Sequence, residues 1–267
     1  MNKNLHVERD GAVTTIIRSR VEARNAMDPA SADALHAALL TFDRDPSQHV
    51  AVLWGAGGAF CAGWDLKHVS TLTAKEQLAA LDFPKDGGPL PRGPLGPTRL
   101  ELSKPVIAAV AGPAVAGGME LALWCDLRVM EETAYFGVYC RRWGVPLIDG
   151  GTVRLPRIVG RGRALDIILT GRKVPAEECY RIGLCERVVP HGESRKAAEA
   201  LAHEIARFPQ ECLRADRRSV WLQEGLSEGE ALRAEWANSA RVVESEGAAG
   251  AARFAAGKGR HGDFSDI

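Results

Sequence analysis

A glutamate that follows two consecutive glycines is the first feature of this sequence that suggests chemistry. The segment 111–126 reads AGPAVAGGMELALWCD, with Gly117 and Gly118 ahead of Glu120. It predicts a strand that runs into the glycines and then into a helix, whose first N–H groups face a space free of side chains. Such N–H groups and the helix dipole favour negative charge. The alternative is a tight Gly-Gly turn with Glu120 as a surface residue.

A second segment, 59–67 (AFCAGWDLK), places Gly63 among small residues. A glycine at a strand end lets the backbone approach a ligand and leaves N–H groups free to donate. Two backbone N–H groups aimed at one oxygen form an oxyanion hole, in which a donor is worth about 3–4 kcal/mol in the transition state. The two segments are compatible with an oxyanion-stabilising site within reach of Glu120, and the alternative of a tight Gly-Gly turn stays open at this point.

Buried strands and a helix are predicted around these segments. Short apolar or β-branched runs at 13–17, 50–54 and 106–110 are typical of buried strands. Between the first two, Asp28 offers an N-cap, Pro29 a first helical residue, and Leu35, Leu39 and Phe42 an apolar helix face. The order strand, helix, strand predicts a parallel sheet, hence an α/β fold.

Two changes of residue pattern follow in the later part of the chain. Residues 81–97 are crowded with glycine and proline, which predicts a long loop, either a lid or binding loop or surface padding. After residue 151 the pattern becomes helical, with predicted helices at 151–159, 164–169, 176–180, 194–207, 209–223 and 227–244.

The composition of the chain indicates which partners and which compartment to expect. The 267 residues carry 34 basic and 34 acidic side chains, a balance that argues against nucleic acid or a membrane surface as the main partner. Six irregularly spaced cysteines predict reduced thiols, and no apolar stretch is long enough to span a bilayer. We expect a cytoplasmic protein.

Several motif-bearing classes are excluded, since the sequence has no HExxH, GxSxG, Walker A or EF-hand motif. A glycine cluster at 55–60 follows a strand, as a dinucleotide fingerprint does, but Phe60 occupies the position of its third glycine. A nicotinamide-dependent oxidoreductase is therefore one alternative.

Together, the two glycine-bearing segments resemble the crotonase family, also called the enoyl-CoA hydratase/isomerase superfamily. Its first motif, A-F-x-A-G-x-D-[IL]-K, matches 59–67, and its second, G-x-[AC]-x-G-G-G-x-E-L-A-x-x-C-D, matches 112–126 except at Ala116. Further matches follow in order along nearly the whole chain, at 136–137, 150–152, 154–156, 169–171, 176–177, 181–184 and 188–190.

The resemblance implies a spiral of ββα units. It divides the chain into an acyl-CoA-binding core, 1–190, and a C-terminal helical region, 191–267, used for trimerisation, often as a dimer of trimers. It also implies an acyl-CoA or enoyl-CoA thioester as substrate, with no cofactor beyond the coenzyme A that the substrate carries.

By motif position, the resemblance assigns the enolate-stabilising N–H groups to Trp64 and Gly117. It places the carbonyl of Ala62 against the adenine and the basic residues Arg24 and Lys67 near the coenzyme A. Asp65 and Cys140 join these three as expected substrate-binding residues.

The sequence differs from the family's hydratases at the position of one catalytic glutamate. Those enzymes use two glutamates, and the second lies four residues beyond the Phe of Phe-Gly, where this chain has Cys140. A thiol with an ordinary pKa near 8.5 is a poor replacement. Asp149 precedes the glycines before a helix, one residue from a family aspartate position, and is either a catalytic partner of Glu120 or a helix cap.

The sequence thus predicts an enoyl-CoA hydratase or lyase with Glu120 as the principal acid or base and Asp149 as its provisional partner. The alternatives are an isomerase, a decarboxylase or other enolate chemistry that needs one carboxylate. A protein that binds acyl-CoA without catalysis is a further alternative.

Overall fold

The computed structural model describes residues 3–71, 79, 81–85, 87–259 and 261. Within these residues, the main sheet has six strands in the order β1-β2-β3-β4-β6-β9. Only the β1–β2 pair is antiparallel there, and the other neighbours are parallel. The strands are β1 (Leu5–Asp10), β2 (Val13–Arg18), β3 (Val50–Gly55), β4 (Val106–Val110), β6 (Leu127–Glu131) and β9 (Arg187–Val189).

The three strands predicted from apolar runs are confirmed as β2, β3 and β4, and all three are buried on both faces. On one face, side chains such as Leu53 pack with helix α1 (Pro29–Arg44). On the other, side chains such as Val52 pack with helix α8 (Ser194–Ala206). Because successive side chains of a strand point to opposite faces, a strand covered on both faces needs mostly apolar or β-branched residues along its length.

Helix α1 begins as predicted. The Asp28 carboxylate accepts a hydrogen bond from Ser31 N at 2.8 Å, and Pro29 is the first helical residue. Leu35, Leu39 and Phe42 are buried against the sheet. The helix connects parallel strands β2 and β3, as the sequence predicts.

A smaller sheet leads into the site, and of its strands only the one ahead of Gly117 and Gly118 was predicted from the sequence, a prediction that the structure confirms. In the described chain it has the order β5-β7-β8, with strands β5 (Pro113–Val115), β7 (Tyr135–Gly137) and β8 (Lys173–Pro175). Strands of three residues are too short to show an alternating pattern. Helix α4 (Gly117–Trp124) follows β5 after one residue, and every residue of it is buried.

The remaining described elements are helices. The short helices near the site are η1 (Val21–Ala23), α2 (Leu66–Val69), η2 (Pro97–Arg99) and η3 (Tyr139–Trp143). The later helices are α5 (Gly151–Val159), α6 (Arg161–Thr170), α7 (Ala176–Arg181), α9 (Gln210–Leu222), α10 (Glu228–Val242), η4 (Val243–Gly247) and α11 (Ala248–Ala255). The predicted C-terminal helices are therefore confirmed. No helix in the described ranges is long and apolar enough to cross a membrane.

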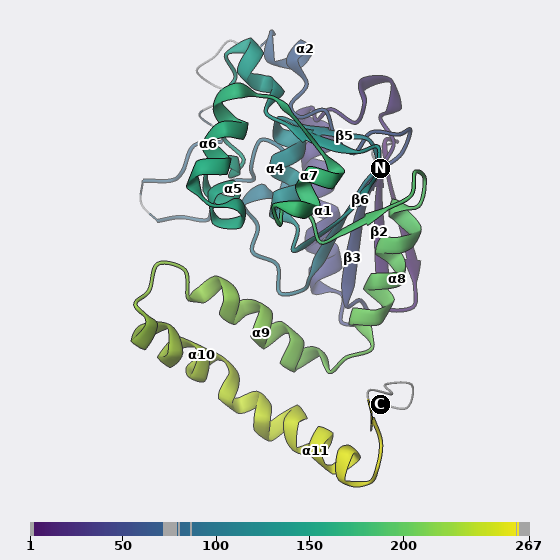
Figure 1. Ribbon diagram of the computed structural model, residues 1–267, viewed down its shortest axis with the longest axis vertical. Helices are drawn as coiled ribbons and strands as arrows, with labels where there is room; N and C mark the ends of the chain where they lie inside the picture. The colour runs from purple at the N-terminus through teal and green to yellow at the C-terminus, as the bar shows by residue number, and fades with distance from the viewer. Residues whose placement is uncertain (1–2, 72–78, 80, 86, 260, 262–267) are drawn as a thin grey trace.

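Helices α9, α10 and α11 form an arm that lies apart from the rest of the molecule in Figure 1, with α9 and α10 side by side. Arg217 of α9 joins the arm to the core through an ion pair with Asp126 (Nε–Oδ1 2.7 Å). The predicted boundary at residue 190 stays a prediction, and α8, which lies beyond it, packs on the main sheet.

The residue between β5 and α4 has a strained backbone. Ala116 has φ 53° and ψ −126°, a conformation that side-chain-bearing residues rarely adopt. It is also the one position at which the second motif departs from the family's glycine. The turn therefore has a backbone conformation that glycine adopts without strain, but an alanine occupies it.

We predict that Ala116→Gly raises the free energy of unfolding by about 1 kcal/mol, because relief of backbone strain outweighs the greater freedom of the unfolded glycine. Urea denaturation checks this. Ala122→Gly, inside α4, is the matched control and should destabilise the protein. A lower unfolding free energy for Ala116→Gly would contradict the strain argument.

Candidate active site

Two backbone segments form the floor of the site, 60–64 after β3 and 113–118 from β5 into α4. Phe60 N and Cys61 N both donate to Pro113 O, at 3.0 and 3.2 Å, and Val115 N donates to Cys61 O at 2.9 Å. A Cβ at Gly118 would lie 2.0 Å from Cys61 O. The second glycine of the Gly-Gly pair is therefore required for this close approach.

The two predicted oxyanion donors, Trp64 and Gly117, line one pocket. Neither N–H group has an acceptor among the residues that the structure describes. Gly117 begins α4, so its N–H has no partner in the preceding turn, and a Cβ at Gly63 would lie 3.0 Å from Gly117 N. These N–H groups are free for a ligand oxygen, and their role as an oxyanion hole stays a prediction.

The pocket that they share has a volume of about 80 Å³. Its walls come from the segment after β3, α4, η3 and the residues before α5. They are Ala62, Trp64, Leu66, Leu95, Ala116, Gly117, Glu120, Tyr139, Cys140, Trp143, Val145, Pro146, Ile148 and Asp149.

Glu120 lies in the first turn of α4 and is 2% exposed, so the alternative of a surface glutamate is wrong. Its Oε1 accepts hydrogen bonds from Asp149 N at 2.9 Å and Gly151 N at 2.8 Å. Burial raises the pKa of Glu120 to about 7, and the charge of Asp149 adds to the rise, while the two N–H groups and Arg154 oppose it. A carboxyl with this pKa exchanges protons near neutral pH.

Cys140 lies in η3 at the position of the family's second glutamate and is buried. Burial raises the pKa of its thiol, and the charge of Glu120 raises it further. Cys140 and Glu120 therefore line the same pocket, and the thiol is neutral near pH 7. Its expected substrate contact stays a prediction.

Asp149 lies in the same pocket wall and is 3% exposed. Its Oδ1 accepts hydrogen bonds from Leu95 N at 3.0 Å and from the Thr98 hydroxyl. Burial raises the pKa of the Asp149 carboxyl, although these two hydrogen bonds lower it. Helix α5 is capped at Gly150 without a side-chain hydrogen bond, so the capping alternative for Asp149 is wrong.

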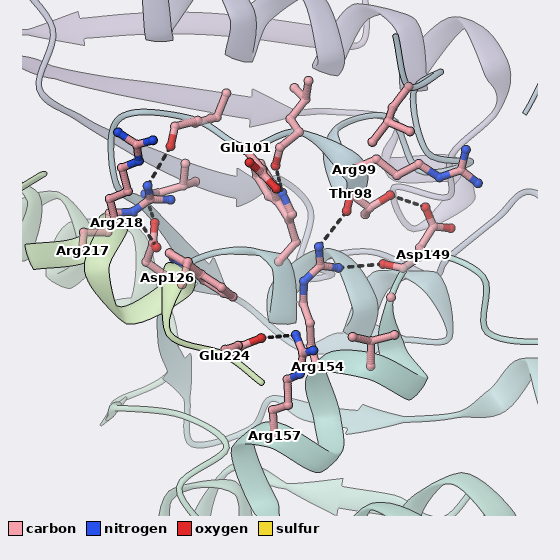
Figure 2. Close-up of a pocket in the computed structure, with 18 of the residues that line it drawn as sticks. Thr98, Arg99, Glu101, Asp126, Asp149, Arg154, Arg157, Arg217, Arg218 and Glu224 are labelled. Atoms are coloured by element: carbon pink, nitrogen blue, oxygen red, sulfur yellow. Dashed lines mark hydrogen bonds and ion pairs between the residues drawn. The ribbon is translucent and has the colours of Figure 1, made fainter. Parts of the chain in front are cut away.

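Arg154 and Thr98 belong to the site but were not singled out from the sequence. Arg154 donates from Nη1 to Asp149 O at 2.9 Å and from Nη2 to Thr98 O at 2.8 Å. Figure 2 shows this guanidinium between the two residues, beside a larger cavity of about 840 Å³ that α9 helps to line. Thr98 is 51 residues from Asp149, and no local pattern signals so distant a contact.

The expected coenzyme A contacts gather at one edge of the loop after β3. Ala62 N donates to Arg24 O at 3.0 Å, and the side chains of Arg24 and Lys67 are exposed. Asp65 Oδ1 accepts from Lys67 N at 3.0 Å, and its Oδ2 pairs with Arg20 at 2.7 Å. Burial disfavours the charged Asp65 carboxyl, but these partners outweigh it and hold its pKa below the usual value. The binding roles stay predictions.

The structure describes the glycine- and proline-rich loop, 81–97, except for residue 86. The C-terminal end of this loop lies at the pocket. Gly93 and Gly96 exchange backbone hydrogen bonds of 3.0 and 2.9 Å, and Leu95 between them is 1% exposed. This end of the loop is therefore a wall of the pocket and not surface padding.

The glycine cluster at 55–60 does not form a dinucleotide site. No helix opens at these glycines, since the next one is α2, which begins at Leu66. A Cβ at Gly55 would lie 2.3 Å from Ala59 O, so this glycine serves a tight turn. The fingerprint needs a helix N-terminus for the pyrophosphate, and the oxidoreductase alternative loses its basis.

Comparison with known proteins agrees with this arrangement. The model of a family described as "Enoyl-CoA hydratase/isomerase" matches residues 8–255. A protein named enoyl-CoA hydratase from Mycobacterium tuberculosis is 37% identical over 234 residues, which cover 85% of this chain and 84% of the relative. A protein named carnitinyl-CoA dehydratase from Salmonella typhi is 37% identical over 207 residues, 77% of this chain and 75% of the relative.

Solved structures match as well. The crystal structure of an enoyl-CoA hydratase from Mycobacterium marinum superposes with a TM-score of 0.84 at 30% identity, covering 94% of this chain and 95% of the other. One from Mycobacterium tuberculosis gives a TM-score of 0.84 at 33% identity over the same shares. The α/β fold predicted from the motifs is thereby confirmed, and the chain belongs to the enoyl-CoA hydratase/isomerase, or crotonase, family.

Proposed function

We propose that the protein adds water to, or removes it from, the 2,3 bond of a coenzyme A thioester. The observation that carries this proposal is a buried carboxyl with a pKa of about 7, Glu120, in one pocket with the free N–H groups of Trp64 and Gly117. The relatives named hydratase and dehydratase support the same class of reaction.

In the proposed reaction the two N–H groups hold the thioester oxygen. As the oxygen of water bonds to C3, the electron pair of the C2–C3 double bond shifts to between C1 and C2, and the C=O pair moves onto the thioester oxygen. The two N–H dipoles stabilise the negative charge of the resulting enolate oxygen. Glu120 takes one proton from the water and then delivers it to C2, so the product gains one hydroxyl and one hydrogen. Because Oε1 is held by two N–H groups, Oε2 is the oxygen that transfers the proton.

A second candidate is isomerisation of the double bond, which needs one carboxyl to carry a proton from one carbon to another. Cys140 favours this candidate. It replaces the second hydratase acid with a thiol whose pKa is raised, and such a thiol is a weak proton donor. Isomerisation of the substrate without hydration would support the isomerase candidate. Coenzyme A binding without turnover would select the non-catalytic alternative.

We further propose that the arm joins copies of this chain, as a homotrimer or a dimer of trimers. Large apolar side chains that lie exposed on or beside α9, α10 and α11 support this proposal, since such surfaces mark interaction sites. They are Val220, Trp221, Leu222, Leu226, Leu232, Trp236, Val243 and Phe254.

We also propose a cytoplasmic location and no cofactor besides the coenzyme A of the substrate. The six cysteines are all free thiols, five of them buried, which is usual in a reducing compartment. The proposed reaction moves only water and a proton, so its chemistry calls for no redox group.

We predict that Glu120→Gln lowers the kcat for hydration of 2-enoyl-CoA thioesters by about 10²–10⁴-fold, the range of general acid–base catalysis. The amide oxygen can still accept from Asp149 N and Gly151 N, so the fold and coenzyme A affinity should persist. Loss of the conjugated thioester absorbance measures the rate, and the exposed Glu132→Gln is the control. Full activity in Glu120→Gln would refute the assignment.

We predict that kcat/KM for hydration rises with pH around a midpoint near 7, because Glu120 must be ionised to accept the proton of water. The parameter kcat/KM reports the free enzyme, to which this pKa belongs. A rate profile over pH 5–9 measures the midpoint. A midpoint near 4, where an ordinary glutamate titrates, would contradict the effect of burial.

We predict that Trp236→Asp, which places a charge on the exposed apolar side of α10, reduces the oligomer to smaller species. Analytical ultracentrifugation measures the mass. Val7→Asp, on the exposed strand β1, is the control and should leave the mass unaltered. A monomeric parent protein would contradict the proposed assembly.

A further inference from the structure

Asp149 connects two parts of the pocket wall that are distant in sequence. Its main-chain N–H donates to Glu120 Oε1 at 2.9 Å. Its side-chain Oδ1 accepts from Leu95 N at 3.0 Å and from the Thr98 hydroxyl. One residue therefore fixes the proposed proton-transfer group through its backbone and the end of the 81–97 loop through its carboxylate.

The loop that the carboxylate holds lies against a proposed oxyanion donor. A Cβ at Gly117 would lie 2.7 Å from Leu95 Cδ2, so the Leu95 side chain covers the start of α4. Leu95 is fully buried and lines the pocket of Glu120. If Leu95 moved away, water would reach the N–H of Gly117 and compete for its hydrogen bond.

Two further contacts make this attachment rigid. The Arg154 guanidinium bridges Asp149 O and Thr98 O, at 2.9 and 2.8 Å, and so joins the two segments a second time. A Cβ at Gly93 would lie 2.8 Å from Asp149 Oδ1, so the loop backbone packs directly on the carboxylate. The side chain of Asp149 is enclosed by the loop that it binds.

We propose that Asp149 is a positioning residue, whose carboxylate holds Leu95 over Gly117 while its backbone orients Glu120, and that it is not the second proton donor. The inference rests on the proposed function, because it assigns Asp149 a role in that reaction. It replaces the catalytic role expected from the sequence with a structural one that has its own measurable consequences.

The charge of Asp149 also affects the pKa of Glu120. Three ionisable groups face Glu120 from the elements packed around α4: Asp149 ahead of α5, Arg154 within α5, and Cys140 in η3. Asp149 raises the pKa of Glu120, whereas Arg154 lowers it. Removing the negative charge but keeping the hydrogen bonds should therefore shift the titration of Glu120 to lower pH.

The test compares Asp149→Asn with Asp149→Ala. The asparagine oxygen can accept from Leu95 N and Thr98, so we expect kcat within about tenfold of the parent, with the midpoint of kcat/KM at lower pH. Asp149→Ala leaves Leu95 N without its acceptor and should lower kcat about 10²-fold, the effect of a misplaced site, with little change in KM.

A second pair of variants covers the case in which Asp149→Ala does not fold. Thr98→Val removes the hydroxyl that donates to Asp149 and should lower kcat, whereas Thr98→Ser keeps a donor and should restore it. Hydrogen–deuterium exchange of residues 92–100 provides a readout that needs no turnover. Exchange there should be faster in Asp149→Ala and Thr98→Val than in the parent, Asp149→Asn or Thr98→Ser.

These outcomes separate the inference from the proposed function. If the parent protein hydrates no enoyl-CoA, the proposed function fails, and the exchange data alone decide whether Asp149 holds the loop. If the parent is active but Asp149→Asn is as inactive as Glu120→Gln with unaltered exchange, Asp149 is a proton donor and the positioning role is overturned. Unaltered exchange in both Asp149→Ala and Thr98→Val would also overturn it.

Discussion

The close approach of two backbone segments is the constraint on which the rest of the site depends. Segments 60–64 and 113–118 share three backbone hydrogen bonds, and Gly118 leaves no room for a side chain against Cys61 O. Parallel strands β3 and β4 place both segments at the same end of the sheet. The central strands β2, β3 and β4 are buried, with α1 and α8 on the two faces of the sheet. In the proposed oxyanion hole, two N–H groups held by this packing would stabilise an oxyanion without reorganisation.

The electrostatics of the pocket follow from where Glu120 lies. Burial disfavours its charge. Glu120 nevertheless lies in the first turn of α4 and accepts hydrogen bonds from two backbone N–H groups, and both features stabilise the anion. These opposing effects leave its pKa at about 7. A more exposed carboxyl would be a weaker base, and a fully desolvated one without donors would stay protonated.

Much of the scaffold could be predicted from the sequence. Strands β2–β4 are short apolar or β-branched runs, and α1 has a regular apolar face and a clear N-cap. The motifs also placed Glu120, Trp64, Gly117 and Cys140 in one pocket. The three-residue strands of the small sheet have no readable periodicity. The partners of Asp149 were not predictable either, since Leu95 and Thr98 lie 54 and 51 residues away and meet it only in the folded chain.

The thiol at Cys140 and the carboxyl of Asp149 are best understood together. Glu120, Asp149 and Cys140 lie around one small pocket, with Arg154 as the nearby cation that lowers the pKa of both carboxyls. A glutamate at position 140 would add a third carboxyl, and like charges in a low-dielectric pocket cannot all ionise. The neutral thiol adds no negative charge beside Glu120 and Asp149, whose pKa values burial already raises. The arrangement that removes a second catalytic acid therefore permits a carboxylate to act in positioning.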